Sequence, residues 1–187
     1  EKNDKKKQNE RKDYNIKFSI IIPTYNRPKS LARSIESVLD QNISNEEYEI
    51  IVVNDGGEEV DNVLDRFEHK NIKYHSHNKN KGPAAARNTG LKESNGQYIS
   101  FLDDDDIFYK NHLSTAKQYL DSGEKVIYTD ALRYSWMKKD EGYEVVEKNV
   151  PYSIDFSREK LLLVNIAPIN CFVFRKDLLE KAGYFDQ

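Results

Sequence analysis

Cysteine, long apolar runs and an excess of one charge sign are all scarce in this chain of 187 residues. A single cysteine, Cys171, cannot form a disulfide within the chain, so we expect it to be buried and expect a reducing, cytoplasmic location. The longest apolar run, residues 20–22 with their flanks, is too short to cross a bilayer, and no signal-peptide pattern is visible. The net charge of -3 argues against a nucleic-acid partner.

Two phosphate-binding patterns are also missing. There is no Gly-x-x-x-x-Gly-Lys-Ser/Thr sequence, and no Gly-x-Gly-x-x-Gly follows the first apolar segment. These absences argue against a P-loop hydrolase and an NAD enzyme. His75 and His77 have no nearby cysteine or further histidine to complete a zinc site, so we interpret them as part of a solvated loop.

Apolar segments alternate between strand and helix patterns over about the first 130 residues. Residues 1–17 are charged and lack apolar periodicity, which indicates a flexible lead-in; contact of this segment with an anionic membrane is an alternative. Residues 18–187 are expected to form one domain, with a nucleotide-binding half at 18–130 and an acceptor half beginning at 131–187. Strands are expected at 18–22, 49–53, 72–75, 97–102, 126–129 and 171–174, and helices near 28–39, 60–67, 83–95, 113–123 and 160–163.

This alternation predicts an α/β fold with an open, mostly parallel, Rossmann-like sheet and helices on both faces. Residues 131–137 and 143–147 depart from it and predict an antiparallel hairpin joined by a polar turn at 138–142. In such a sheet, ligands bind beyond the carboxyl ends of the strands, at the switch in strand order. Three polar clusters follow predicted strands: residues 23–26, Asp55 and residues 103–106. We therefore expect them to converge on one site.

The four consecutive aspartates, residues 103–106, carry the strongest chemical signal. Their mutual repulsion costs free energy unless a cation neutralises it, and Mg²⁺ or Mn²⁺ prefers such carboxylate oxygens. In an extended chain Asp103 and Asp105 point the same way and can share a metal, while Asp104 points oppositely. The alternative is a solvated acidic turn in which Asp106 caps the following helix.

Asp55 and Tyr25 suit the recognition of a nucleotide base. An ionised carboxylate only accepts hydrogen bonds, so Asp55 suits the ring N–H of uracil, thymine or guanine and not the matching edge of adenine. The aromatic ring of Tyr25 can stack on a base. The alternatives are an Asx-turn for Asp55 and ordinary packing at a strand end for Tyr25.

Five segments together resemble the family 2 glycosyltransferases of GT-A fold. They are residues 18–27 (FSIIIPTYNR), 49–57 (EIIVVNDGG), 80–90 (NKGPAAARNTG), 96–106 (GQYISFLDDDD) and 179–186 (LEKAGYFD). The resemblance implies an inverting, metal-dependent transfer of a sugar from a nucleotide-diphosphate donor to a carbohydrate or lipid-linked acceptor, in polysaccharide or glycoconjugate synthesis. UDP is the favoured nucleotide, with GDP and dTDP open, and contact with the inner face of a membrane is part of the same expectation.

The resemblance also implies roles for individual residues. Pro23, Thr24 and Tyr25 line the nucleotide pocket, and Asp55 accepts the base N–H. Asp103 and Asp104 face ribose and diphosphate, Asp105 is the main Mn²⁺ or Mg²⁺ ligand with Asp103 as a second, and Arg87 contacts the nucleotide or forms a surface ion pair.

The general base that an inverting transfer requires is not found in the sequence. In the family it follows a stretch like residues 183–186, so we expect it beyond Gln187 and expect these residues to bind donor better than they turn it over. Two further hypotheses remain, a nucleotidyltransferase and a nucleotide-sugar-binding module without turnover. The sequence leaves the oligomeric state open.

Overall fold

The computed structural model describes residues 16–67, 71–139 and 142–186. Most of the predicted lead-in, residues 1–15, therefore lies outside the described residues. Its last two residues already belong to the fold, because the backbone N–H of Lys17 donates to the carbonyl of Glu47 and that of Gln97 donates to the carbonyl of Ile16. The described fold thus includes two residues that were predicted to belong to the lead-in.

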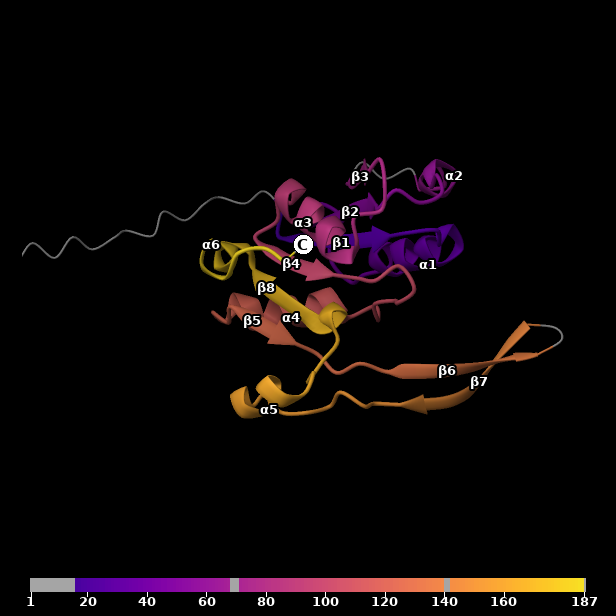
Figure 1. Cartoon of the computed structure of the whole chain (residues 1–187). Helices are drawn as coiled ribbons and strands as arrows, with labels where there is room; N and C mark the ends of the chain where they lie inside the picture. The colour runs from indigo at the N-terminus through magenta and orange to yellow at the C-terminus, as the bar shows by residue number, and fades with distance from the viewer. Residues whose placement is uncertain (1–15, 68–70, 140–141, 187) are drawn as a thin grey trace, which may run out of the picture.

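A six-stranded sheet forms the centre of the molecule (Figure 1). Its order is β3-β2-β1-β4-β8-β5; the first four strands are parallel to one another, and β8 runs antiparallel to β4 and β5 on either side. The strands are β1 (Phe18–Thr24), β2 (Tyr48–Asn54), β3 (Ile72–Ser76), β4 (Tyr98–Phe101), β5 (Val126–Tyr128) and β8 (Phe172–Arg175). The mostly parallel sheet expected from the sequence is confirmed.

The five predicted helices are present in the described part of the chain, and a sixth, α6, was not predicted. They are α1 (Pro28–Leu39), α2 (Asp61–Leu64), α3 (Pro83–Glu93), α4 (His112–Asp121), α5 (Arg158–Leu163) and α6 (Leu179–Ala182). Both α1 and α3 carry proline in the first turn, where the missing N–H costs no hydrogen bond. The helix expected at 60–67 is shorter than predicted, because α2 spans four residues.

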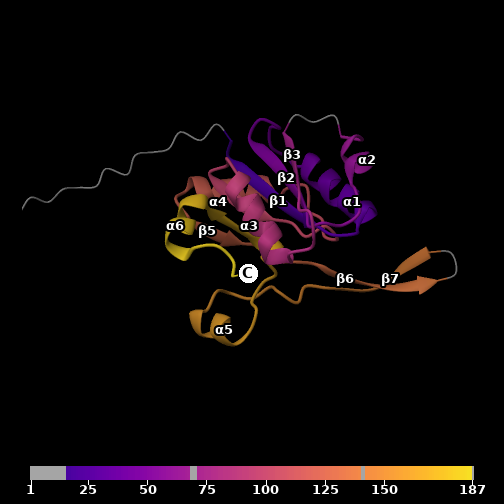
Figure 2. The same ribbon diagram turned by 45° about the horizontal axis from the view of Figure 1, so that its top comes forward.

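Helices cover both faces of the sheet, so β1 and β2 are buried on both sides. On one face, alternate residues of β1 pack with Leu31 and Ile35 of α1 and with Leu113 of α4. On the other face, Ile21 of β1 packs in a cluster with α3 and with Leu179 of α6. Figure 2 shows α3 and α6 together on this second face. This double burial explains the uninterrupted apolar character of the strands.

Helix α3 approaches the sheet very closely at Gly90. A Cβ atom built on Gly90 would lie 2.3 Å from Cγ2 of Ile21 in β1. Only a residue without a side chain fits this contact, so Gly90 sets the distance between α3 and the sheet.

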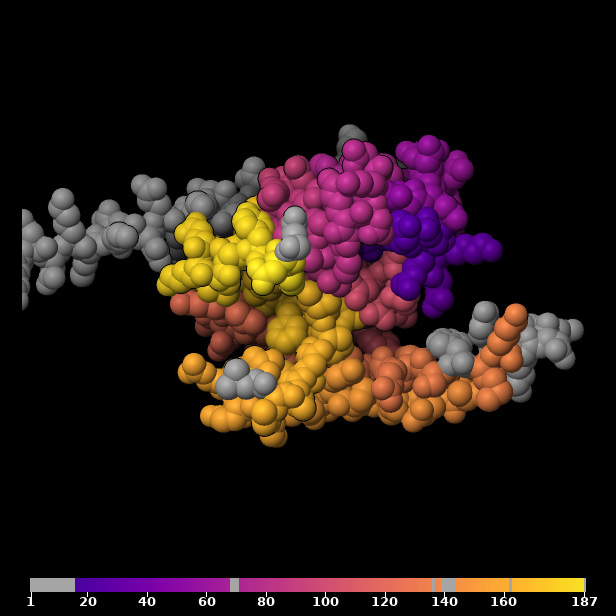
Figure 3. Space-filling model, in the orientation of Figure 1, coloured from indigo at the N-terminus to yellow at the C-terminus, as the bar shows by residue number. Residues whose placement is uncertain are grey.

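The predicted hairpin is present as β6 (Arg133–Lys139) and β7 (Gly142–Asn149), which pair only with each other. Strand β6 has the predicted length but begins two residues later than predicted, and β7 is longer than predicted; residues 140–141 between them are outside the described part. The hairpin extends beside the body as an arm, orange in the space-filling view (Figure 3). Within the described residues, no helix has the length and apolar character needed to cross a membrane.

Candidate functional site

A cavity of about 500 Å³ opens at the carboxyl ends of β1, β2 and β4. Strand β1 lies between β2 and β4, so this is the switch in strand order where a ligand is expected. All eight residues nominated from the sequence line it: Pro23, Thr24, Tyr25, Asp55, Arg87, Asp103, Asp104 and Asp105. Arg27, Asn80, Pro83 and Ala86 complete the lining. The size is within the range of small-molecule sites.

The aspartates form a turn and not an extended chain. The backbone N–H of Asp106 donates to the carbonyl of Asp103 over 3.0 Å, which closes the turn. The expectation that Asp103 and Asp105 point the same way was based on the geometry of an extended chain, which this segment does not have. The chain turns directly after β4, so the side chains of Asp103, Asp104 and Asp105 acquire different partners.

Asp104 is the buried member of the turn, with an exposed fraction of 5%. Its Oδ2 accepts a hydrogen bond of 2.7 Å from the hydroxyl of Thr24, and its Oδ1 lies 3.1 Å from Nη1 of Arg27. The same Nη1 lies 2.6 Å from Oδ2 of Asp105. The hydrogen bond to Asp104, reinforced by the charge of Asp105, raises the pKa of Arg27 above its ordinary value. Two carboxylates therefore converge on one cationic nitrogen.

Asp103 is paired separately with Arg87. Nη2 of Arg87, on α3, donates to Oδ1 of Asp103 over 2.7 Å. Nε of Arg87 is shielded from solvent and has no hydrogen-bond partner within the described residues. Arg87 therefore forms an ion pair, as one of our two expectations had it, and also lines the cavity; its contact with a nucleotide stays a prediction.

Asp106 does not cap the following helix, contrary to one of our expectations. Helix α4 begins at His112 with Asn111 in the cap position. The carboxylate of Asp106 accepts a 2.6 Å hydrogen bond from Asn170 instead. Asp106 keeps contact with solvent, yet partial burial, and then repulsion from Asp105, Asp103 and Asp104, raises its pKa to about 6. The turn thus carries more negative charge than its two arginines neutralise.

Asp55 is held by three donors from the segment that follows β3. Nδ1 of His77 lies 2.7 Å from its Oδ1, which also accepts from the N–H of Lys81 at 3.0 Å, while the N–H of Gly82 donates to its Oδ2 at 2.8 Å. Our interpretation of His75 and His77 as a solvated loop is wrong. His75 lies in β3, and the side chain of His77 is buried, with an exposed fraction of 8%.

The carboxylates fit a divalent cation that is completed by a phosphate ligand. No group of three or more His, Cys, Asp or Glu residues in the described part of the chain is arranged to hold a metal alone. Asp104 and Asp105 nevertheless converge on the positive Nη1 of Arg27, which shows that a cation is stabilised at that point. Mg²⁺ is usually held by one or two carboxylates together with substrate phosphates.

Sequence reasoning missed three residues with defined contacts here: Arg27, His77 and Asn88. The side chain of Asn88, next to Arg87 on α3, donates to the carbonyl of Phe185 and accepts from its N–H, at 2.8 and 2.9 Å. The C-terminal segment is thereby fixed beside α3, as Figures 1 and 2 show. The sequence shows only that Asn88 stands next to an arginine in a predicted helix. Its partner, Phe185, lies 97 residues away in the chain, so the sequence gives no indication of the contact.

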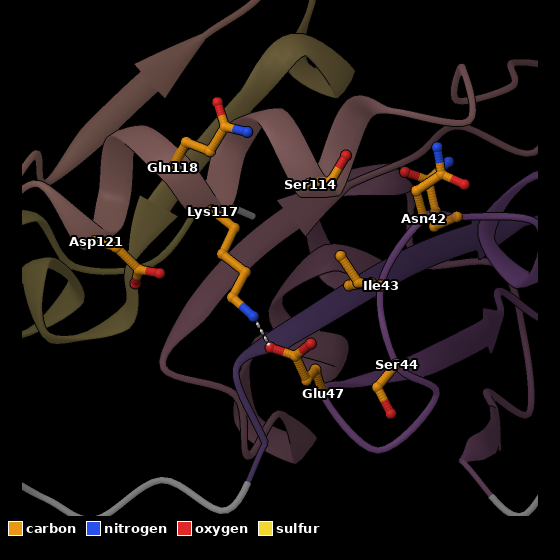
Figure 4. Close-up of a pocket in the computed structure, with 9 residues that line it drawn as sticks. Asn42, Ile43, Ser44, Glu47, Ser114, Lys117, Gln118 and Asp121 are labelled. Carbon is orange, nitrogen blue, oxygen red and sulfur yellow. Dashed lines mark hydrogen bonds and ion pairs between the residues drawn. The ribbon is translucent and has the colours of Figure 1, made fainter.

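A second cavity, of about 630 Å³, lies between the α1–β2 connection and α4. In Figure 4, Lys117 of α4 extends across it to an ion pair with Glu47. Glu47 directly precedes β2, so this cavity is at the amino ends of the parallel strands, away from the aspartate turn. It supplies a control position for binding experiments.

Comparisons with known proteins agree with this geometry. The model of glycosyl transferase family 2 matches residues 19–183. An uncharacterized glycosyltransferase of Rickettsia bellii (strain RML369-C) is 48% identical over 107 residues, which cover 56% of this chain and 15% of that protein. The uncharacterized glycosyltransferase YwdF of Bacillus subtilis (strain 168) is 33% identical over 172 residues, covering 91% of this chain and 62% of YwdF.

A solved structure shares the fold. The crystal structure of S. aureus TarS 1-349 in complex with UDP-GlcNAc superimposes with a TM-score of 0.67 and 26% sequence identity, over 91% of this chain and 49% of that one. The chain belongs to glycosyl transferase family 2, and its fold is of the GT-A type. It spans less than two thirds of the length of these relatives.

Proposed function

We propose that this chain binds a nucleotide-diphosphate sugar, with UDP as the nucleotide, and forms the donor half of an inverting glycosyltransferase. The observation that carries the proposal is the convergence of Asp55, the aspartate turn and two arginines on one cavity at the strand switch point. The likeness to TarS, whose structure was solved with UDP-GlcNAc, supports UDP and makes an N-acetylhexosamine the first sugar to test.

The roles follow from position and remaining hydrogen-bond capacity. Tyr25, 45% exposed, offers a ring face to the base, and Asp55 accepts the base N–H. The Nε of Arg87 has no partner among the described residues, and it can donate to a phosphate oxygen once the side chain turns it from its shielded position toward the cavity. Thr24 keeps the carboxylate of Asp104 oriented while a ligand binds.

Charge balance supports a dependence on Mn²⁺ or Mg²⁺. Three carboxylates at the cavity, Asp103, Asp104 and Asp105, pair with two arginines, and a diphosphate would add negative charge to the same place. We assign Asp105 and Asp104 to the cation, since their oxygens already share the positive Nη1 of Arg27, which must move away when a metal binds. A bound cation would stabilise the charge that develops on the leaving nucleotide.

The acceptor hydroxyl needs a general base within hydrogen-bond reach. Asp103, Asp104 and Asp105 are each engaged by Arg27 or Arg87, so we assign them to the donor and none of them to the base. A carbohydrate or lipid-linked acceptor, a cytoplasmic location and contact with a membrane surface belong to the same proposal.

Calorimetry with UDP, GDP and dTDP, with and without Mn²⁺, tests the proposal directly. We expect UDP to bind with the highest affinity and Mn²⁺ to increase that affinity. Asp105→Asn should lower the affinity for UDP in the presence of Mn²⁺ about tenfold and so remove most of the increase, because the variant loses a charged contact to the metal. Lys117→Ala, in the second cavity, is the control and should bind UDP normally. If none of the three nucleotides binds with Mn²⁺ or Mg²⁺, the proposal is wrong.

A further inference from the structure

His77 is buried beside the site, and the roles assigned above do not use it. Its backbone N–H donates to the carbonyl of Asn54 over 2.8 Å, which fixes the residue beside the end of β2. Its ring is held on both sides, with Nδ1 2.7 Å from Oδ1 of Asp55 and Nε2 2.9 Å from the hydroxyl of Thr89 on α3. A buried histidine with both ring nitrogens engaged has one orientation available.

The contacts define a direction for each proton. An ionised Asp55 accepts only, so Nδ1 of His77 carries the proton that it donates, and a neutral ring then accepts at Nε2 from the hydroxyl of Thr89. Thr89 is therefore the outer support: its hydroxyl orients the ring of His77, and the ring in turn orients the carboxylate of Asp55. The chain of contacts connects α3 to the base-reading carboxylate without touching the cavity, since neither His77 nor Thr89 lines it.

The carboxylate of Asp55 keeps room for one further donor. Its two oxygens offer about four acceptor positions. Oδ1 takes His77 and the N–H of Lys81, and Oδ2 takes the N–H of Gly82. The position that remains is on Oδ2, and Asp55 lines the cavity. Rotation of the carboxylate about its bond to Cβ would move that position, and the hydrogen bond from His77 opposes this rotation.

We infer that His77 is a positioning residue for base recognition: held by Thr89, it orients the Asp55 carboxylate so that one oxygen meets the ring N–H of a pyrimidine-dione base such as uracil. The inference rests on the proposed binding of a uridine nucleotide at this site. The proposed function gives His77 no role, whereas here His77 contributes to the choice of base although it does not touch the nucleotide.

The test compares two substitutions that each keep one half of the histidine. The shorter amide side chain of His77→Asn places its N–H near the position of Nδ1 and retains the donor to Asp55. The longer side chain of His77→Gln places its amide near Nε2, so it retains the contact to Thr89 and loses the donor to Asp55. Thr89→Val removes the outer support with little change of shape. The intact protein is titrated with UDP and with N3-methyl-UDP, which lacks the ring N–H, and the thermal midpoint of each variant is recorded.

In the unsubstituted protein, UDP should bind about tenfold to a hundredfold more tightly than N3-methyl-UDP, the range for a hydrogen bond to a charged group. His77→Asn should keep most of that preference, Thr89→Val should keep part of it, and His77→Gln should reduce it to about threefold or less. Equal losses for both nucleotides in both His77 variants, with the preference unchanged, would overturn the inference and leave the proposed function standing. Absence of UDP binding to the unsubstituted protein would overturn both.

Discussion

Gly90 is the residue through which the packing of α3 against β1 can be tested most directly. In Gly90→Ala the new methyl carbon would lie 2.3 Å from Cγ2 of Ile21 and 3.1 Å from its Cγ1, where ordinary carbon contacts are about 3.5–4.0 Å. Ile21 is fully buried, so its side chain has no free space to enter. Overpacking of this severity costs about 3 kcal/mol, and the better helix propensity of alanine returns about 1 kcal/mol.

We therefore expect Gly90→Ala to lower the free energy of unfolding by about 2 kcal/mol and the melting temperature by about 4–8 °C. Urea unfolding followed by circular dichroism measures the first quantity. Lys92→Ala, on an exposed position of the same helix, is the matched control and should change stability by less than about 0.5 kcal/mol. Because Arg87 is carried by α3, the affinity for UDP should fall along with stability.

A double-mutant cycle isolates the contact. Ile21→Ala alone should cost about 3 kcal/mol through lost burial, but it also removes the atoms that clash with the new methyl group. The double variant should then cost about 2 kcal/mol, because the gain of about 1 kcal/mol in helix propensity remains while the clash is gone, and not the additive value of about 5 kcal/mol. A Gly90→Ala protein as stable as the unsubstituted one, or strict additivity in the cycle, would refute the close approach of α3 to β1.

Three further predictions concern ionisable groups. Burial lowers the pKa of His112 from 6.5 to about 4, so the unfolded chain binds more protons and stability falls as the pH drops from about 6.5 to 4. Urea unfolding at pH 7.5 and at pH 4.5 should show a loss of about 2 kcal/mol in the unsubstituted protein that His112→Gln lacks. Equal losses in the two proteins would contradict the burial of His112. Glu49→Ala should cost about 3 kcal/mol in urea unfolding, because the buried carboxylate pairs with Lys73 at 2.7 Å; a loss below about 1 kcal/mol would show that the pair is not needed. Arg27→Gln should strengthen Mn²⁺ binding to the nucleotide-free protein about threefold to tenfold, because Arg27 no longer competes with the metal for the carboxylates of Asp104 and Asp105. Electron paramagnetic resonance measures this affinity. Unchanged or weaker binding would contradict the competition.

Much of the fold and the location of the site were predictable because they depend on local patterns and one topological rule. The apolar runs that became β1 and β2 are continuous because both faces of these strands are buried. Once a parallel sheet was expected, the polar residues after its strands had to meet at one edge. Asp55, Arg87 and the aspartates at 103–105 were found in this way or through the family resemblance, and all line the cavity.

Partners of the site residues were not predictable, because they are distant in sequence and depend on side-chain geometry. Arg27 meets Asp104 across 77 positions of the chain, and no periodicity reports such a contact. The turn at residues 103–106 was not predicted either, because four identical residues contain no signal for where a strand ends, and it gives Asp103 and Asp105 different partners. His77 was misjudged for a related reason, because a polar loop sequence gives no indication that one of its members is buried.

The position of β8 between β4 and β5 has a consequence for the order in which the protein assembles during synthesis. Strands β1 to β4, which lead into Asp55 and the aspartate turn, are neighbours in the sheet and are all synthesised before β5 and β8. Strand β5 pairs within the described sheet only with β8, which follows the whole hairpin and α5. Until β8 arrives, β4 presents an open edge and β5 has no neighbour, and open strand edges promote association between chains. The four parallel strands can thus pair before β8 is synthesised, and we expect the interval before β8 emerges to be the period in which the nascent chain is most exposed to aggregation.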